Sequence, residues 1–280
     1  MIKTYFINYI MDKIGIIGMG VVGKAIHSFY IRRISKLWLY DKYKNIGTIK
    51  NVANNCRIIY VAVPTPYKKN VGYNLKELTD VLGQLENELI KLNKMCVILI
   101  KSTILPGTSD KLSNLFPYLN IIYNPEFLSN LTAIEDFCNP KQIILGKTLI
   151  SSNNVFKNIV KIHKKYWPDV LITSTTAVNA ECTKIFLNNF YAVKIQFFNE
   201  LWYLVKSLQI NKHYDVNYKE ILKIMINNGW LNPMHTSVPG SDGLLSYGGK
   251  CFPKDTGALL EMMKSFSPYY KVLETVIEER

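Results

Sequence analysis

The stretch KIGIIGMGVVGKAI, residues 13–26, decides the fold expected for the first half of the chain. A short apolar run meets three glycines, Gly18, Gly20 and Gly23, and a helical pattern follows them. In such a turn one glycine allows the tight bend, the next lets the backbone approach a pyrophosphate, and the third lets helix and strand pack closely. The amides at the start of the helix then face the phosphates. The stretch therefore predicts a strand, a turn and a helix that together bind a dinucleotide.

Asp41 supplies the second part of this signal, because it stands 18 residues beyond Gly23, at the end of a strand predicted over residues 37–40. A carboxylate at this point accepts hydrogen bonds from the adenosine ribose and repels a 2′-phosphate. We therefore expect the cofactor to be NAD rather than NADP. Lys42 and Lys44 lie close by in the sequence and weaken this preference slightly.

Strand and helix patterns alternate from the glycine turn to about Gly146. Further strands are predicted over residues 57–63, 95–100, 119–123 and 142–145, and an amphipathic helix over residues 75–92. Alternation of this kind is typical of an α/β protein with a parallel, doubly wound sheet of the Rossmann type.

The second half of the chain has a mainly helical pattern. Helices are predicted over residues 154–166, 175–208 and 218–227, a loop over 228–253, and a helical tail over 256–280 that breaks near Pro268. The inner face of the long central helix is expected to carry Ile185, Val193, Phe197, Leu201 and Leu204. We predict an appendage over residues 1–12, a Rossmann domain over 13–173 and a helical domain over 174–280.

The composition excludes several classes of partner. No apolar run reaches the roughly 18 residues needed to cross a bilayer, so no membrane is expected. The net charge is +13, but Lys and Arg are spread along the chain without a dense run, so nucleic acid is not expected either. The five scattered cysteines include no C-x-x-C pair and fit reduced thiols better than a disulfide framework or a zinc site. We expect no metal and a cytoplasmic location.

Five further stretches carry side chains suited to chemistry. They are VAVPTP (61–66), IKSTILPGT (100–108), YNPEFLSNLTAIEDF (123–137), AECTKIFLNNF (180–190) and VPGSDGLLSYGGKCFPKD (238–255). In the last one Cys251 follows two glycines that permit close approach of a ligand, and Lys250 and Lys254 would favour its thiolate. From these residues alone, a small buried apolar cysteine is the better interpretation. Lys184 and Asn188 are four residues apart and share one side of the long helix.

In this order the motifs resemble those of the UDP-glucose/GDP-mannose dehydrogenase family. K-S-T-[VI]-x-x-G-T, N-P-E-F-L, E-x-x-K-x-x-x-N and G-G-x-C-x-x-K-D all occur between about residues 13 and 260. VPG-x-DG leading into YGG-x-CFPKD looks most like the UDP-glucose 6-dehydrogenase branch. The resemblance implies an NAD-dependent, four-electron oxidation of UDP-glucose to UDP-glucuronate in two hydride transfers.

The resemblance also implies roles for individual residues. Cys251 would attack the intermediate aldehyde to give a thiohemiacetal, which is oxidised to a thioester and hydrolysed. The catalytic residues would be Cys251, Lys184 and Asn188 (oxyanion stabilisation and proton transfer), Asp255 (activation of water), Glu126 (acid/base in hydrolysis) and Thr103 (water or the nicotinamide ribose). Cofactor contacts would come from Gly18, Gly20, Val21, Val22, Gly23, Asp41, Thr65, Thr103 and Lys254. Substrate contacts would come from Glu126, Phe127, Leu128, Lys184, Asn188, Tyr247, Gly248 and Gly249.

Each of these roles has a plainer alternative in the sequence. Lys184 with Asn188 fits a solvated lysine beside an asparagine, Glu126 fits a carboxylate in a loop or at the start of a helix, and Thr65 fits a turn between two prolines. The chain also departs from the family pattern, with Asn130 in place of a common glutamate and Ser246 in place of a common glycine.

The family usually continues beyond the point where this chain ends, into a third domain that grips the uridine diphosphate. We therefore expect intact NAD binding but weaker sugar-nucleotide binding, unless a homodimer partner adds contacts through the long helix over residues 175–208. Three alternatives stay open. The same chemistry could act on GDP-mannose or an N-acetyl sugar nucleotide, the chain could be a β-hydroxyacid dehydrogenase that transfers one hydride without a cysteine, or it could be a non-catalytic NAD-binding protein.

Overall fold

The computed structural model describes residues 13–280, and the appendage expected over residues 1–12 lies outside the described residues. The chain divides into two compact units: unit 1 holds residues up to Pro66 and Tyr73–Lys184, and unit 2 holds Tyr67–Gly72 and Ile185–Arg280. The division into functional domains at residues 173 and 174 concerns cofactor and substrate binding, which compactness does not test, and it stays a prediction.

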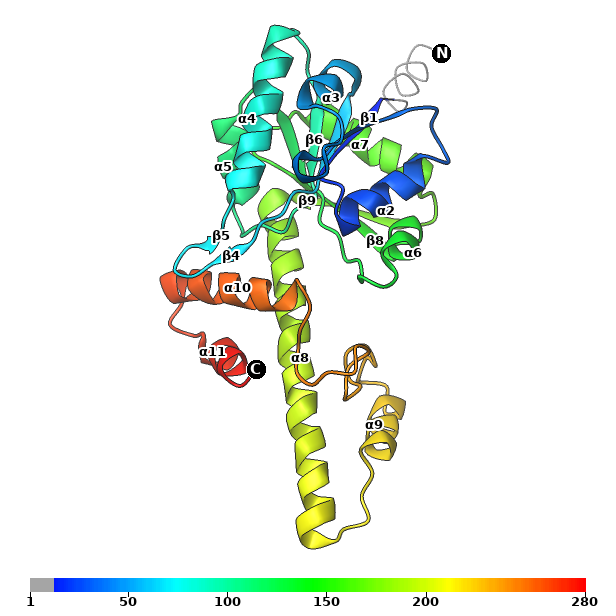
Figure 1. The fold of residues 1–280 in the computed structure, drawn as a ribbon, viewed down its shortest axis with the longest axis vertical. Helices are drawn as coiled ribbons and strands as arrows, with labels where there is room; N and C mark the ends of the chain where they lie inside the picture. The colour runs from blue at the N-terminus through cyan, green and yellow to red at the C-terminus, as the bar shows by residue number, and fades with distance from the viewer. Residues whose placement is uncertain (1–12) are drawn as a thin grey trace. The chain divides into compact units, whose positions relative to one another are not determined.

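Unit 1 is a seven-stranded sheet with helices on both faces (Figure 1). Its elements are β1 (Ile14–Ile17), α2 (Val21–Tyr30), β2 (Leu37–Tyr40), the 3-10 helix η1 (Lys42–Lys44), α3 (Ile49–Asn55), β3 (Ile58–Val61), α4 (Lys76–Lys91), β6 (Val97–Ile100), α5 (Thr108–Leu115), β7 (Asn120–Tyr123), α6 (Ala133–Cys138), β8 (Gln142–Lys147), α7 (Asn153–Tyr166) and β9 (Leu171–Thr176). The Rossmann-type fold expected from the glycine turn is confirmed.

The strand order is β2-β1-β3-β6-β7-β8-β9, and the first five strands are parallel to one another. β8 differs from the expected all-parallel sheet because it runs antiparallel to β7. β9 was not expected at all, and it pairs in parallel with β8 from Gln142 opposite Leu171 to Lys147 opposite Thr176. Its sequence, LITSTT, is polar and largely exposed at the sheet edge, so no apolar run marks it as a strand.

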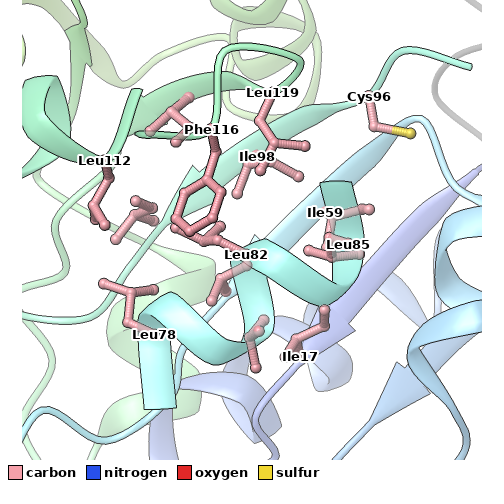
Figure 2. Close-up of a cluster of buried hydrophobic side chains, with 14 of the residues drawn as sticks. Ile17, Ile59, Leu78, Leu82, Leu85, Cys96, Ile98, Leu112, Phe116 and Leu119 are labelled. Atoms are coloured by element: carbon pink, nitrogen blue, oxygen red, sulfur yellow. The ribbon is translucent and has the colours of Figure 1, made fainter. Parts of the chain in front are cut away.

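Successive residues of the central strands face opposite sides of the sheet, which gives unit 1 two apolar clusters. Ile17, Ile59 and Ile98 pack against α3, α4 and α5, and this cluster is drawn in Figure 2. Their neighbours Ile16 and Ile58 pack on the other face against α2, α6 and α7. Burial of one such side chain contributes about 1.5–3 kcal/mol, so both clusters stabilise the frame that carries the glycine turn.

Unit 2 contains most of the long helix and the C-terminal helices. α8 (Ala177–Lys212) passes through the boundary between the units, and α9 (Tyr218–Asn227), α10 (Phe252–Phe266) and α11 (Lys271–Glu278) follow. The break expected near Pro268 is confirmed, since it separates α10 from α11. No helix among residues 13–280 is long and apolar enough to cross a membrane.

The inner face expected for α8 is partly wrong. Ile185 is buried, and Val193 and Leu201 are half-buried, but Phe197 and Leu204 are exposed at 52% and 54%. The buried side of the helix consists largely of alanine and amide side chains: Ala192, Asn188, Asn189, Gln196 and Asn199. The prediction followed apolar residues around the helix, whereas hydrogen-bonded amides share the buried positions with Ile185, Phe198 and Val205.

A short hairpin of β4 (Tyr67–Lys68) and β5 (Gly72–Tyr73) was also missed by the sequence reading. Its residues 67–72 group with unit 2, where the Tyr67 hydroxyl donates to Glu261 at 3.0 Å and the Asn70 amide donates to the same oxygen at 3.1 Å. A Cβ on Gly257 would lie 2.9 Å from the Tyr67 ring. Glycine at this point of α10 therefore lets the hairpin lie directly on the helix.

Candidate functional site

The glycine turn in unit 1 has the shape that a pyrophosphate requires. Gly18 has φ +88°, and a Cβ there would lie 2.5 Å from the Ala62 carbonyl oxygen. A Cβ on Gly23 would lie 1.8 Å from the Gly18 carbonyl oxygen, so helix and turn touch at this point. A Cβ on Gly20 would meet no described atom within 4 Å. Gly18 and Gly23 are thus glycine for packing, whereas Gly20 leaves open space beside the first turn of α2.

That first turn also presents donors to an anion. α2 begins at Val21 with Gly20 as its N-cap, and no side chain caps it. The amides of the first helical turn have no partner inside a helix and carry the positive end of the helix dipole. The open space at Gly20 and these amides together fit the phosphates of a dinucleotide.

Asp41 lies beside the glycine turn, as its spacing predicted. Its Oδ2 accepts a hydrogen bond from the Met19 amide at 2.7 Å, and its Oδ1 accepts from the amides of Tyr43 and Lys44 at 3.0 Å each. A hollow next to it is lined by Gly18, Asp41, Tyr43, Glu77 and Asp80 among others. Three carboxylates around one hollow disfavour a 2′-phosphate, which supports NAD.

The two lysines that weakened the NAD preference both have partners here. The Lys42 ammonium lies 3.7 Å from Glu77, and the Lys44 ammonium donates to the Met19 carbonyl oxygen. The Glu77 carboxylate offsets part of the Lys42 charge, and Lys44 is directed at the backbone of the glycine turn. The geometry thus strengthens the case made by Asp41.

Thr65 and Thr103 meet where β3 and β6 end. The Thr65 hydroxyl donates to the Thr103 carbonyl oxygen at 2.7 Å, and the Ser102 hydroxyl donates to the Val63 carbonyl oxygen at 2.6 Å. These bonds hold two adjacent loops together at the carboxyl edge of the parallel strands. Cofactors of open α/β sheets bind at that edge.

Glu126 and Lys184 form a buried ion pair, with 3.1 Å between Oε1 and Nζ and side-chain exposures of 10% and 4%. The Glu126 Oε2 accepts from the Leu128 amide at 2.7 Å, and the Lys184 ammonium lies 5.1 Å from the centre of the Phe127 ring. Burial alone would raise the pKa of Glu126, but the Lys184 ammonium and the Leu128 amide outweigh burial and lower it. The Glu126 carboxylate is therefore held in its ionised form.

Lys101 lies next to this ion pair, although it was not among the expected site residues. Its ammonium is buried and donates to the Asn124 Oδ1 at 3.0 Å and to the Pro125 carbonyl oxygen at 3.2 Å, so it holds the backbone just before Glu126. Burial lowers the pKa of Lys101 to about 7, against the opposing effect of Glu126. The only sequence signal was its place in the KST motif.

In unit 2, Cys251 is exposed and stands immediately before α10, as its N-cap residue. The start of a helix stabilises negative charge on a neighbouring group. Cys251 is therefore not the small buried apolar cysteine that the residues alone had favoured. Asp255, in the first turn of α10, donates its amide to the Cys251 carbonyl oxygen at 2.9 Å.

The Asp255 carboxylate is completely buried and bound on both sides. It accepts from the Asn188 Nδ2 at 2.6 Å, and the Lys254 ammonium contacts its other oxygen. The structure thus brings together three of the expected residues, Asn188, Lys254 and Asp255. Since Lys254 is engaged by Asp255, its expected contact with the cofactor stays a prediction.

The loop before Cys251 is held by amides of α8. Ser246 has φ +61°, and its amide donates to the Asn199 Oδ1 at 2.9 Å while its hydroxyl donates to the Gln196 Oε1 at 2.7 Å. Tyr247 is buried, and its carbonyl oxygen accepts from the Arg280 Nε at 3.0 Å. Gln196 and Asn199 were missed because amides on a helix carry no motif.

The two glycines between this loop and Cys251 are open. A Cβ on Gly248 or on Gly249 would meet no atom of residues 13–280 within 4 Å, and Gly249 has φ +71°. The Tyr247 side chain is buried against Ala192 and Val276 of unit 2. Its expected contact with the substrate stays a prediction. Within the described part of the chain, no group of three His, Cys, Asp or Glu side chains could hold a metal ion.

The sheet order, the glycine turn and the carboxylate at the end of β2 define the class of this protein: it is a Rossmann-type NAD-binding protein. Residues 34–166 match the NAD-binding domain of the UDP-glucose/GDP-mannose dehydrogenase family, and residues 178–279 match the central domain of that family. The chain therefore belongs to the UDP-glucose/GDP-mannose dehydrogenase family.

Curated relatives agree with this assignment. A UDP-glucose 6-dehydrogenase of Rickettsia typhi is 30% identical over 245 residues, which are 85% of this chain and 52% of the relative. A UDP-glucose 6-dehydrogenase of Campylobacter jejuni is 27% identical over 238 residues, 85% of this chain and 55% of the relative. The chain thus spans about half the length of the curated relatives it matches.

Solved structures show the same fold at low identity. A UDP-glucose dehydrogenase from Pyrobaculum islandicum has a TM-score of 0.80 at 20% identity, with 95% of this chain and 68% of that chain covered. A 3-hydroxyisobutyrate dehydrogenase from Mycobacterium tuberculosis has a TM-score of 0.68 at 11% identity, with 95% of this chain and 91% of that chain covered. The fold is therefore shared with a sugar-nucleotide dehydrogenase and with a hydroxyacid dehydrogenase.

Proposed function

We propose that the chain oxidises the primary alcohol of UDP-glucose to a carboxylate, with NAD as the hydride acceptor and Cys251 as the covalent nucleophile. The observation that carries the proposal is the exposed Cys251 at the start of α10, one helical turn from the buried Asp255 and its partner Asn188. A sequence with this cysteine and a Rossmann NAD domain has the two parts that a four-electron oxidation needs.

The cofactor would be held mainly by residues of unit 1, with Lys254 of unit 2 as a further contact. The open space at Gly20 and the amides of Val21 and Val22 would bind the pyrophosphate, and Asp41 would bind the adenosine ribose. Thr65 and Thr103 would border the nicotinamide end, at the edge where β3 and β6 finish. Bound NAD supplies the acceptor for one hydride in each of the two oxidations.

The covalent steps would use the cysteine. The Cys251 thiolate would attack the carbon of the aldehyde formed by the first oxidation and make a thiohemiacetal. Removal of a hydride from that carbon and of a proton from its hydroxyl group gives a thioester. Attack by water then breaks the C–S bond, releases the carboxylate and returns the thiol, so no oxidant beyond NAD is needed.

Charged side chains would stabilise and move protons in these steps. Lys184 would stabilise the developing oxyanion, and Glu126, whose pKa is lowered mainly by Lys184 against the effect of burial, would accept the proton of the attacking water. Asn188 would assist as a donor, and Asp255 would help to activate water while it holds Asn188 in place. Phe127, Leu128, Gly248 and Gly249 would border the sugar.

We further propose that α8 forms a homodimer interface and that the protein acts in the cytoplasm. The support for the interface is a series of large exposed side chains on α8, namely Phe186, Phe190, Phe197, Tyr203 and Leu204. Exposed apolar patches of this kind mark protein interfaces. Sedimentation of the purified chain tests the dimer directly.

The proposal is tested by counting NADH. UDP-glucose and NAD should yield two NADH per sugar together with UDP-glucuronate, and Cys251→Ala should give no UDP-glucuronate while it still binds NAD. GDP-mannose and N-acetyl sugar nucleotides, run in parallel, distinguish the substrate. One NADH per substrate, unchanged in Cys251→Ala, would instead indicate a single-hydride enzyme of the kind whose fold it shares. NAD binding without turnover would indicate a non-catalytic protein.

A further inference from the structure

Glu181 is a completely buried carboxylate one helical turn before Lys184, and none of the expected roles uses it. Its Oε2 accepts from the Gly107 amide at 2.6 Å, and its Oε1 accepts from the Ser109 amide at 2.7 Å. Both amides belong to the start of α5, where Gly107 is the N-cap and provides no side-chain cap. A carboxylate on α8 therefore caps the first turn of α5.

This arrangement costs more free energy than a helix cap at the surface would. Taking a carboxylate out of water is expensive, and a local Ser, Thr or Asp at the N-cap position satisfies the same amides at the surface. Here the cap comes instead from a residue that is 74 positions away from Gly107 in the sequence. The bond thus ties two elements together rather than serving α5 alone.

The two tied elements both carry site residues. The segment before α5 contains Lys101, Ser102 and Thr103, which meet the loops after β3 and before Glu126. On α8, Glu181 and Lys184 are three residues apart and share a face of the helix. Lys184 is in turn 3.1 Å from Glu126. The bond at Glu181 therefore fixes both the rotation and the height of the turn from which Lys184 reaches Glu126.

We propose that Glu181 is a positioning residue: it clamps the first turns of α8 to the start of α5 and thereby holds the Lys184 ammonium on Glu126. The inference rests on the proposed function for its kinetic consequences, but the clamp itself is a property of unit 1. Loss of the clamp leaves the glycine turn and Asp41 unchanged, because neither contacts Glu181 in the described hydrogen bonds.

The charge of Glu181 adds a second feature to the clamp. Burial raises the pKa of Glu181 to about 7, against the opposing hydrogen bonds from Ser109 and Gly107, and Asp110 on α5 raises it further. Burial, and then the charge of Glu181, raise the pKa of its neighbour Cys182 on α8. A protonated carboxyl has one good acceptor oxygen instead of two, so the clamp loosens as the pH falls below about 7.

Glu181→Gln is the informative variant, because it keeps the size of the side chain and imitates the protonated carboxyl at every pH. Glu86→Gln is its matched control: Glu86 also accepts from a backbone amide of unit 1, that of Tyr118 at 2.9 Å, but it lies on α4 and its bond ties α4 to the segment after α5. Glu181→Asp keeps the charge on a shorter side chain and should restore part of the wild-type behaviour. Near-UV circular dichroism confirms that each variant is folded.

The first measurement needs no substrate. The Lys184 side chain is almost completely buried in its ion pair with Glu126. Its rate of acylation by an amine-reactive ester, measured by peptide mass spectrometry, therefore reports how often the pair opens. We expect acylation of Lys184 to be about tenfold faster in Glu181→Gln, since a loss of about 1.4 kcal/mol in the pair corresponds to that factor, and unchanged in Glu86→Gln. Wild-type Lys184 should also react faster at pH 6 than at pH 8 once the reagent's own pH dependence, taken from exposed lysines, is removed.

The second measurement is the turnover of UDP-glucose. Glu181→Gln should lower kcat about tenfold with the affinity for NAD within twofold, and it should lose the part of the pH profile centred near 7. Unchanged acylation of Lys184, together with faster hydrogen exchange at Gly107 and Ser109, would overturn the proposal and leave Glu181 as a cap for α5. If the wild type does not turn over any sugar nucleotide, the proposed function fails while the acylation result still decides the clamp.

Discussion

The two compact units of this chain are stabilised in different ways. Unit 1 has an apolar cluster on each face of its sheet, and residues such as Ile17, Ile59 and Leu82 are completely buried. In unit 2 the buried cluster around Ala192 and Tyr247 is small, and half of the buried side chains of α8 there are amides. The expected cofactor residues are thus held in place by apolar packing, whereas the loop before Cys251 is held in place by hydrogen bonds.

The difference has a physical consequence for mutations. Apolar burial contributes much free energy without direction, while one hydrogen bond contributes only about 0.5–1.5 kcal/mol but fixes an orientation. Changes in unit 1 should therefore appear first as a loss of stability. Changes to the amides of unit 2 should appear first as a displacement of the loop that leads to Cys251.

The largest effect is expected at Gly23. Its Cβ would lie 1.8 Å from the Gly18 carbonyl oxygen, so Gly23→Ala should force the turn open, lower the free energy of unfolding by at least about 3 kcal/mol and abolish NAD binding. Gly20→Ala is the matched control, because its Cβ meets only open space. It should weaken NAD binding, measured by calorimetry, with no loss of stability in denaturant unfolding. Equal stability losses in both variants would contradict the distinction between packing and cofactor glycines.

A smaller effect is expected from the apolar frame. Leu82→Ala removes a completely buried side chain of α4 and should lower the free energy of unfolding by about 2–5 kcal/mol. Ile90→Ala, on the exposed side of the same helix, should change it by less than about 0.5 kcal/mol. Urea unfolding of the two variants measures the difference. Equal losses in the two variants would contradict the division of α4 into a buried and an exposed side.

The buried His163 on α7 makes unit 1 sensitive to acid. Burial lowers its pKa to about 4, with a further contribution from Lys101 and against the bond to the Ile159 carbonyl oxygen. The unfolded imidazole has its ordinary pKa of about 6.5, so between these values the unfolded state binds the proton more tightly. Stability is therefore complete above pH 6.5 and falls as the pH drops toward 4.

The expected size of this acid effect is about 2–3 kcal/mol by pH 4.5, since one pKa unit corresponds to about 1.4 kcal/mol. Denaturant unfolding at pH 7 and pH 4.5 measures it. The loss between the two pH values should be smaller in His163→Gln by that amount, whatever the stability of the variant at pH 7. The same slope in His163→Gln and in the wild type would assign the acid sensitivity to other groups.

The smallest effect is expected at Ser246 in unit 2. Ser246→Ala removes the bond to Gln196 but keeps a side chain at φ +61°, so it should cost about 1 kcal/mol. Ser246→Gly loses the same bond, but it relieves the left-handed backbone by a similar amount and should be nearly neutral. Thermal unfolding of the pair isolates the backbone contribution. If Ser246→Gly were the less stable of the two, the conformation at this residue would not be strained.

Sequence patterns predicted unit 1 well because their rules are local. The turn at Gly18, the carboxylate at Asp41 and the apolar spacing of α4 each follow from residues close together in the chain. β9 was missed because an edge strand with polar residues carries no apolar period. The role of Glu181 could not be foreseen, since its partners lie more than 70 residues away and their contact depends on the tertiary fold.

In unit 2 the rules for helices predicted the extent of α9 and the break after α10, but not which side of α8 is buried. An amphipathic reading assigns apolar residues to the inside. On α8 the buried side includes Asn188, Gln196 and Asn199, which bind Asp255 and Ser246, far away along the chain. Buried amides of this kind have no signature in a single sequence.

The hairpin that packs on α10 determines how the protein can be dissected. Because residues 67–72 group with unit 2 while the chain on both sides of them groups with unit 1, no single cut in the backbone yields the two units as separate polypeptides. A fragment that starts at Ile185 would lack Tyr67 and leave Glu261 without the hydroxyl and amide that it binds. Any attempt to express the cysteine-bearing half alone must therefore graft the hairpin back onto it, or expect a helix with an uncovered face at Gly257.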